Sequence, residues 1–131
     1  MPAKSQLCFK QLPDLFGVCK LPADALFPAW LPAHDVLFIA RTSDELSIMC
    51  AQKYIPSEQD ASRDWYCLRV DGDLAFDEVG VVARVASPPA DAGLSIFVIS
   101  THDRDYVLVA KKDLEHAFQT YRQAGFLIDA L

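Results

Sequence analysis

Two short segments in the second half of the chain carry residue types suited to binding a small charged molecule. Residues 72–80 contain glycines and acids and lead into a predicted helix. The unpaired backbone N–H groups and the dipole of a helix start attract a carboxylate. Gly80 lets the backbone come close to a ligand because it has no side chain. Glu78, in the first turn, could bind an ammonium group or a basic side chain.

The second segment, residues 100–105, lies between two apolar runs. Ser100 and Thr101 offer hydroxyl groups where the first run ends, and Asp105 offers a carboxylate just before the second run. In the expected topology the two segments can lie near one another. If Glu78 and Asp105 face one pocket, a basic amino acid becomes a plausible ligand, because two carboxylates suit a guanidinium fork.

Each of these residues also has a purely structural interpretation. Glu78 is favoured at a helix start by the dipole alone, and Gly80 can permit close packing of a helix on a sheet. Ser100 and Thr101 can satisfy backbone groups at a strand end. The aspartates of the second segment are typical turn formers. The sequence leaves both interpretations open.

Patterns of catalysis and metal binding are missing from the sequence. It contains no GxSxG, P-loop, GxGxxG or CxxC motif, and its three histidines show no metal-ligand spacing. We therefore expect no catalytic residue, no metal, no cofactor and no enzymatic activity. Free and mostly buried thiols are expected at all four cysteines, which are Cys8, Cys19, Cys50 and Cys67.

The composition limits the size and the partners of the protein. The chain has 131 residues and a formal charge of −6, which suits one domain or two very small ones. Its acidic balance argues against nonspecific binding to nucleic acid or to an anionic membrane surface. No apolar run approaches the ~20 residues of a membrane span, and the N-terminus lacks the hydrophobic region of a signal peptide. We expect a cytoplasmic protein.

The second half predicts the element order β-α-β-β-α-β, which is that of a ferredoxin-like unit with an antiparallel sheet and two helices on one face. Pro88-Pro89 predicts a kink or a break one turn before the end of the first helix. Gly93 and Gly125 are expected to end the two helices. The expected elements are strands at 66–70, 94–100, 106–110 and 126–128, and helices at 76–92 and from 114 to Gly125.

The first half appears strand-rich and irregular. Pro13-Asp14 predicts a turn between two strands, and three prolines in residues 22–34 exclude a long helix there. The polar segment 56–64 is typical of a linker. The predicted strands are 5–12, 15–21, and a hairpin of 36–42 with 46–50.

Residues 76–109, FDEVGVVARVASPPADAGLSIFVISTHDRDYVLV, resemble the core of an ACT domain, as in the regulatory domains of aspartate kinase. ISTHDRDYVLV, RTSDELSIMC and WYCLRVDGDL are similar to segments of the tandem-ACT group that includes the CASTOR-type arginine sensors and small bacterial proteins. The resemblance covers roughly residues 35–131 and the rest more loosely.

This resemblance implies an α+β fold of two ferredoxin-like, ACT-type units side by side. Residues 1–60 would form a degenerate, proline-rich unit and residues 61–131 an ACT domain. It also implies a non-catalytic regulatory module that binds an amino acid at an interface between units. The ligand-binding residues would be Leu74, Glu78, Val79, Gly80, Ser100, Thr101 and Asp105.

A homodimer is expected, because pairing covers surface that small units leave exposed. A regulatory module must also pass its signal to a protein partner that the sequence does not name. The alternative is a protein-interaction or oligomerisation module with a degenerate pocket, favoured by the apolar strand SIFVIS at residues 95–100.

Overall fold

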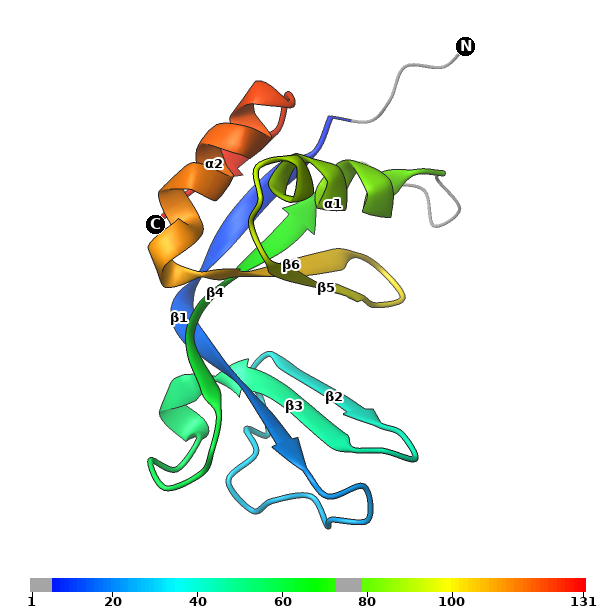
Figure 1. Cartoon of the computed structure of the whole chain (residues 1–131), viewed down its shortest axis with the longest axis vertical. Helices are drawn as coiled ribbons and strands as arrows, with labels where there is room; N and C mark the ends of the chain where they lie inside the picture. The colour runs from blue at the N-terminus through cyan, green and yellow to red at the C-terminus, as the bar shows by residue number, and fades with distance from the viewer. Residues whose placement is uncertain (1–5, 73–78) are drawn as a thin grey trace. The chain divides into compact units, whose positions relative to one another are not determined.

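The computed structural model describes residues 6–72 and 79–131 of the chain (Figure 1). These residues form a mixed α+β structure. The strands are β1 (Cys8–Leu21), β2 (Leu37–Arg41), β3 (Leu46–Ala51), β4 (Ser62–Asp71), β5 (Ile96–Ser100), β6 (Asp105–Ala110) and β7 (Leu127–Asp129). The helices are α1 (Val81–Asp91) and α2 (Leu114–Gln123), with 3-10 turns η1 (Gln52–Tyr54) and η2 (Lys111–Asp113).

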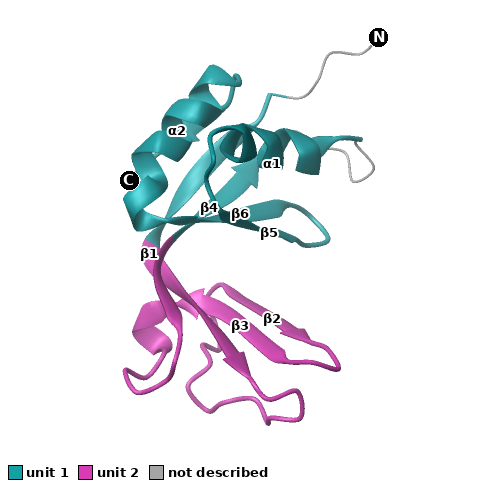
Figure 2. Ribbon diagram, viewed as in Figure 1, with its two compact units in different colours: residues 1–13, 66–131 teal, residues 14–65 magenta. Residues whose placement is uncertain are grey.

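The chain divides into two compact units (Figure 2). The first, which we call the helical unit, joins the described residues up to Pro13 with those from Tyr66 to the C-terminus. The second, which we call the strand unit, comprises Asp14–Trp65. β1 and β4 contribute residues to both units. These compact units divide the chain at other residues than the predicted ACT-type units, 1–60 and 61–131. The division into two ACT-type units therefore stays a prediction.

The helical unit has a sheet in the order β7-β1-β4-β6-β5. β5 and β6 form an antiparallel hairpin, and β7 lies parallel to β1. Side chains from three strands and both helices share one core, so the helices cover a face of this sheet; examples are Phe9, Leu68, Val85, Val107 and Tyr121, each at most 2% exposed. The predicted α+β arrangement of a ferredoxin-like unit is confirmed here. Neither helix, within the described chain, has the length and apolar character to cross a bilayer.

The strand unit contains the predicted hairpin of β2 and β3, with β3 also antiparallel to β1. Its core gathers Leu46, Ile48, Cys50 and Ile55, with Trp30 packed against them. Residues 14–65 are all described and contain the 3-10 turn η1 but no α-helix. A second βαββαβ copy in the first half of the chain is therefore not confirmed.

The prediction of two strands separated by a turn at Pro13-Asp14 is wrong, because β1 continues through both residues. Proline normally interrupts a strand since it lacks the N–H that a ladder needs. β1 pairs with β7 through Cys8–Lys10 and with β3 through Phe16–Leu21. Pro13 lies between these two ladders, so its missing N–H breaks neither of them.

α1 does not break at Pro88-Pro89, because both prolines lie inside the helix, and the kink that was predicted as the alternative stays a prediction. Pro89 has no N–H to donate to the carbonyl of Val85, its partner four residues earlier. The hydroxyl of Tyr121, on α2, donates to that carbonyl at 2.7 Å instead. Gly93 ends the helix as predicted, and the N–H of Leu94 donates to the carbonyl of Pro89 at 2.9 Å.

The predicted linker 56–64 is shorter than expected, because β4 begins at Ser62. The side chain of Arg63 donates to the carbonyls of Pro56 and Gln59 at 2.9 and 3.0 Å. Asp64, with a φ of 66°, exchanges two hydrogen bonds with the side chain of Gln52. These contacts order a segment whose composition is that of a loop.

The cysteines are free, and three of the four are buried, as expected. Burial raises the pKa of the Cys50 thiol to about 11 and that of Cys67 to about 12, so both are protonated at neutral pH.

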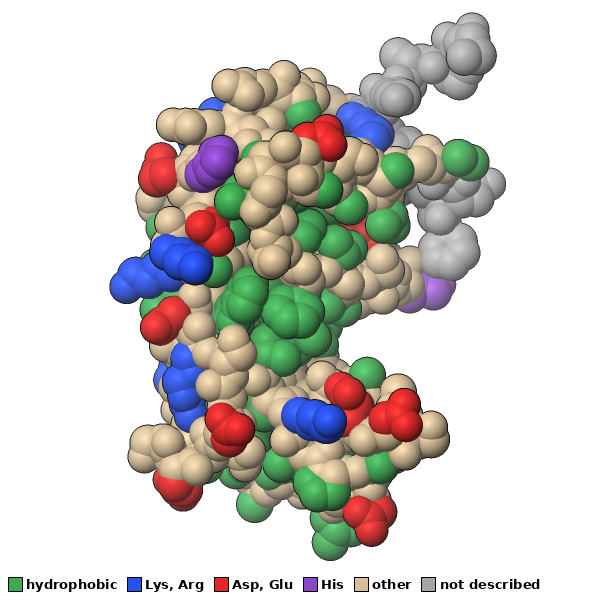
Figure 3. Space-filling model, viewed as in Figure 1, with side chains coloured by type: hydrophobic (Ala, Val, Ile, Leu, Met, Phe, Trp, Pro, Cys, Tyr) green, Lys and Arg blue, Asp and Glu red, His purple; other side chains and the backbone are tan. Residues whose placement is uncertain are grey.

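On the face shown in Figure 3, acidic and basic side chains are interspersed.

Candidate functional site

The start of α1 is the first part of the predicted site. Leu74 and Glu78 lie outside the described residues. Val79 is 93% exposed, and Gly80 is the N-cap of α1 with a φ of 85°. Among the described residues, no side chain caps this helix start with a hydrogen bond. A Cβ added at Gly80 would meet nothing within 4 Å, so the backbone here borders open space.

The hairpin turn between β5 and β6 is the second part. The hydroxyl of Ser100 donates to Oδ1 of Asp105 at 2.5 Å, and Asp105 is only 8% exposed. The N–H and the hydroxyl of Thr101 both donate to the carbonyl of Arg104 at 2.9 Å. Ser100, Thr101 and Asp105 therefore make the hydrogen bonds within the turn that their structural interpretation requires. Their role in ligand binding stays a prediction.

An ion-pair cluster joins the two predicted segments at their ends. Arg104, in the turn, donates from Nη1 to Oδ1 of Asp71 at 2.6 Å. Arg69 binds the same carboxylate with two bonds, Nε to Oδ1 at 2.8 Å and Nη2 to Oδ2 at 3.0 Å. Hydrogen bonds from Arg69, with the charges of both arginines, lower the pKa of Asp71. Asp71 ends β4, so the turn contacts the strand end from which residues 72–80 continue.

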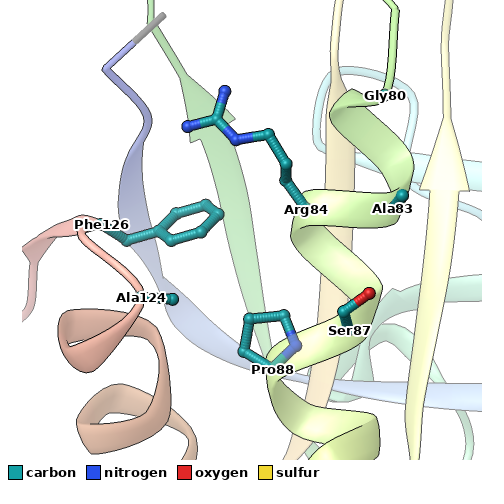
Figure 4. A pocket seen from close by; sticks show the side chains of 7 residues that line it. All are labelled: Gly80, Ala83, Arg84, Ser87, Pro88, Ala124 and Phe126. Carbon is teal, nitrogen blue, oxygen red and sulfur yellow. The ribbon is translucent and has the colours of Figure 1, made fainter. Parts of the chain in front are cut away.

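An open groove lies between α1 and the end of α2 (Figure 4). It encloses about 500 Å³, and Arg84 and Phe126 approach each other across it, with the guanidinium carbon 6.0 Å from the ring centre. Gly80 is the predicted residue that also lines this groove. The other lining residues are Ala83, Arg84, Ser87, Pro88, Ala124 and Phe126.

Sequence reasoning missed the arginines of the ion-pair cluster as site residues. A signal was present, since Arg69 and Asp71 are two apart in a strand and so share a face. Nothing in the sequence indicates that Arg104, distant by 33 residues, joins them. In the described part of the chain, no group of three or more His, Cys, Asp or Glu side chains is placed to hold a metal ion.

Family models match both halves of the chain. Residues 60–122 match the model of the ACT domain. Residues 14–58 match the model of an N-terminal domain. The first match lies mostly in the helical unit and the second lies within the strand unit.

The family of the chain is shown by its similarity to a protein of solved structure. A protein of Agrobacterium tumefaciens is 36% identical, with a TM-score of 0.90, over 96% of this chain and 94% of that one. The chain belongs to the same family as this Agrobacterium protein.

The chain is also similar to parts of two proteins whose functions are named. The human "Cytosolic arginine sensor for mTORC1 subunit 1" is 40% identical over 81 residues, which cover 56% of this chain and 25% of that protein. The chain thus spans about a quarter of the length of this relative. Aspartate kinase of Clostridium acetobutylicum superposes over 91% of this chain and 34% of its own, with a TM-score of 0.63 and 9% identity, which shows a shared fold.

Proposed function

We propose that the protein is a non-catalytic regulatory module of the cytoplasm that binds a free amino acid. The observation that carries this proposal is the ACT-domain match over residues 60–122, a range that contains all seven predicted ligand residues. The similarity to an arginine sensor supports the choice of an amino acid as the ligand class.

The chemistry of the helix start suits such a ligand. An uncapped helix N-terminus offers backbone N–H groups to the ligand's carboxylate. Open space at Gly80 admits a ligand close to the backbone. In this proposal Glu78 receives the ammonium group, while Leu74 and Val79 contact the aliphatic part of the ligand. Ser100, Thr101 and Asp105 form the opposite wall, and a second ACT-type unit completes the interface.

A thermal-shift screen of the full chain against the twenty amino acids tests this function. A true ligand at a hundred times its Kd adds about 2.7 kcal/mol to the free energy of unfolding. For a chain of this size that raises Tm by several degrees. Calorimetric titration of the amino acid that shifts Tm gives its affinity. If no amino acid at millimolar concentration moves Tm, the proposed function is wrong.

Two glycine substitutions separate ligand binding from stability. Gly80→Ala and Gly93→Ala both place a side chain at a positive φ, 85° and 76°, with nothing within 4 Å of the new Cβ. Each should cost about 1 kcal/mol of stability for the left-handed backbone. Only Gly80→Ala should lower the affinity for the amino acid, because Gly93 lies beyond the C-terminal end of α1. Equal affinities for the two variants would contradict the proposed site.

The alternative, an assembly module, is favoured by one observation. β5 is the last strand of the sheet order and pairs with β6 alone among the described strands. Its four apolar residues, Ile96–Ile99, are only partly buried. An apolar edge strand invites pairing with a second copy.

Sedimentation of the wild type and of Ile99→Lys tests this pairing. Ile96 and Val98 pack against the core, so Ile99 projects from the other face of the sheet. A lysine on an edge strand discourages strand addition. A wild-type dimer that Ile99→Lys dissociates, and that Val82→Lys on α1 leaves intact, supports the edge interface; a monomeric wild type excludes it.

A further inference from the structure

The ion-pair cluster of Arg69, Asp71 and Arg104 connects the end of β4 with the turn between β5 and β6. All three residues belong to the helical unit. The side chains of Arg69 and Arg104 are 32% and 39% exposed, so solvent molecules reach both guanidinium groups. Two guanidinium groups share one carboxylate, which leaves the cluster with a net charge of +1.

The guanidinium groups keep unused hydrogen-bond donors. Arg69 uses Nε and Nη2 for Asp71, and Arg104 uses Nη1. Within residues 6–72 and 79–131, Nη1 of Arg69 and both Nε and Nη2 of Arg104 make no hydrogen bond. A guanidinium group carries five N–H donors in a planar fork that matches a carboxylate. The carboxylate of Asp71 holds the two forks in place at little entropic cost to an incoming anion.

The turn presents both the Arg104 guanidinium group and the Asp103 carboxylate to solvent, whereas the predicted ligand residue Asp105 is buried. Asp105 is 8% exposed and its Oδ1 is bonded to Ser100. Arg104 is the exposed charged side chain of this turn that contacts the end of β4. An approaching ligand therefore meets guanidinium groups before it meets the Asp105 carboxylate.

We infer that Arg69 and Arg104 form an anion subsite that binds a carboxylate group of the ligand, with Asp71 holding both side chains in position. This inference rests on the proposed function and changes one part of it: the two arginines, in place of the start of α1, receive the ligand's carboxylate. The ligand must carry a carboxylate that the two arginines receive, and an amine that has lost its carboxylate should bind poorly. Arg69 and Arg104 then contribute to affinity directly, and Asp71 is a positioning residue.

The test titrates the full chain, at constant ionic strength, with succinate, L-glutamate, L-arginine and agmatine, which is arginine without its carboxylate. The Nε–Hε signals of the arginines are followed by NMR. Succinate and the two amino acids should shift the signals of Arg69 and Arg104, and agmatine should not. Arg104→Gln should lower the affinity for succinate about tenfold or more, since it removes a charge-assisted hydrogen bond to the ligand. Arg122→Gln, a matched change at an exposed arginine of α2, should leave the affinity unchanged.

Asp71→Asn separates a binding role from a merely structural one. If the arginines bind a carboxylate, Asp71→Asn should tighten succinate binding several-fold even though it destabilises the fold. The asparagine keeps an acceptor oxygen that positions the arginines, but it removes the negative charge that competes with succinate. If the cluster is only structural, Asp71→Asn lowers stability and succinate affinity stays the same or falls, which overturns the inference. Arg104→Lys, which keeps the charge, serves if Arg104→Gln does not fold, and it should bind succinate with intermediate affinity.

The outcomes distinguish this inference from the proposed function. An amino acid that stabilises the wild type without moving the Arg104 signal, and equally stabilises Arg104→Gln, leaves the proposed function standing and overturns the subsite. Succinate binding at the arginines with no amino acid raising Tm supports the subsite and removes the proposed amino-acid ligand. Failure of succinate to shift either arginine signal overturns the subsite.

Discussion

Tyr121 provides a hydrogen bond that α1 lacks because of its own sequence. Its hydroxyl donates to the carbonyl of Val85, which would otherwise have no helical partner because residue 89 is a proline. Burial raises the pKa of the Tyr121 hydroxyl, so it stays a donor at all ordinary pH values. One residue on α2 thus makes the Pro88-Pro89 pair compatible with a continuous α1.

Replacing Tyr121 by phenylalanine should therefore destabilise the protein by about 1–3 kcal/mol, because a buried carbonyl loses its donor. In a Pro89→Ala background, residue 89 regains an N–H for the same carbonyl, so the same replacement should cost less. Urea denaturation of the four proteins of this double-mutant cycle measures the difference. Equal costs in both backgrounds would show that the hydroxyl does not compensate for the proline.

Asp71 makes stability depend on pH in a known direction. Its pKa is lowered from 3.8, first by the hydrogen bonds from Arg69 and then by the charges of both arginines. A carboxyl group whose pKa is lower in the folded state stabilises that state above the unfolded pKa. This contribution is lost as the pH falls through the folded pKa.

The stability difference between the wild type and Asp71→Asn should accordingly be constant from pH 7 to about pH 5 and shrink below about pH 4. Denaturation curves across this range measure it. Asp44→Asn, in the exposed turn between β2 and β3, serves as the control and should show little effect. A difference that persists unchanged at the lowest pH would mean that the ionised carboxylate of Asp71 is not what stabilises the fold.

At the scale of elements, one side chain of a neighbouring strand helps to order a proline-rich loop, whose Trp30 also packs against the core of the strand unit. Arg41, at the end of β2, donates from Nη1 to the carbonyl of Ala23 and from Nη2 to that of Ala25 at 2.7 Å. Its guanidinium carbon lies 5.5 Å from the ring centre of Phe27. The loop therefore has a defined conformation without belonging to a helix or a strand.

Arg41→Lys should loosen this loop, because an ammonium group cannot reproduce the planar fork. We expect amide hydrogen exchange to accelerate in residues 22–31 and the global stability to fall by only about 1 kcal/mol. Arg122→Lys, the same change in the helical unit, is the matched control and should leave this loop unaffected. Unchanged exchange in Arg41→Lys would assign the order of the loop to its prolines instead.

At the scale of the whole molecule, each compact unit has its own buried core. The core of the helical unit and that of the strand unit share no residue. β1 and β4 each contribute residues to both units, so the covalent backbone passes from one unit to the other within a strand. Core substitutions should therefore act mainly on the unit that contains them.

Ile48→Ala and Val109→Ala form a matched pair for this expectation. Each substitution truncates a fully buried aliphatic side chain, Ile48 in the strand unit and Val109 in the helical unit. Each should lower the free energy of unfolding by about 2–4 kcal/mol. Hydrogen exchange should accelerate most in residues 14–65 for Ile48→Ala and most in residues 66–131 for Val109→Ala. Uniform acceleration in both variants would show that the two units unfold as one.

The sequence alone determined the elements whose signals are local. Apolar runs joined by short polar turns predicted the strands β2, β3, β5 and β6, and helical spacing with a terminal glycine predicted α2. These signals are reliable because they involve residues close together in the chain. The resemblance of residues 76–109 to ACT domains was also readable, and the family match over residues 60–122 agrees with it.

Tertiary structure decided what depends on residues far apart in the chain. Only the fold places the Tyr121 hydroxyl at the carbonyl of Val85, so only the fold shows that Pro88-Pro89 continues a helix. Likewise Arg104 meets Asp71 across 33 residues, while Asp105 turns inward to Ser100. Local sequence specifies which charges are present, but the direction in which each one faces follows from packing, which buries Asp105 and leaves the Arg104 guanidinium group partly exposed.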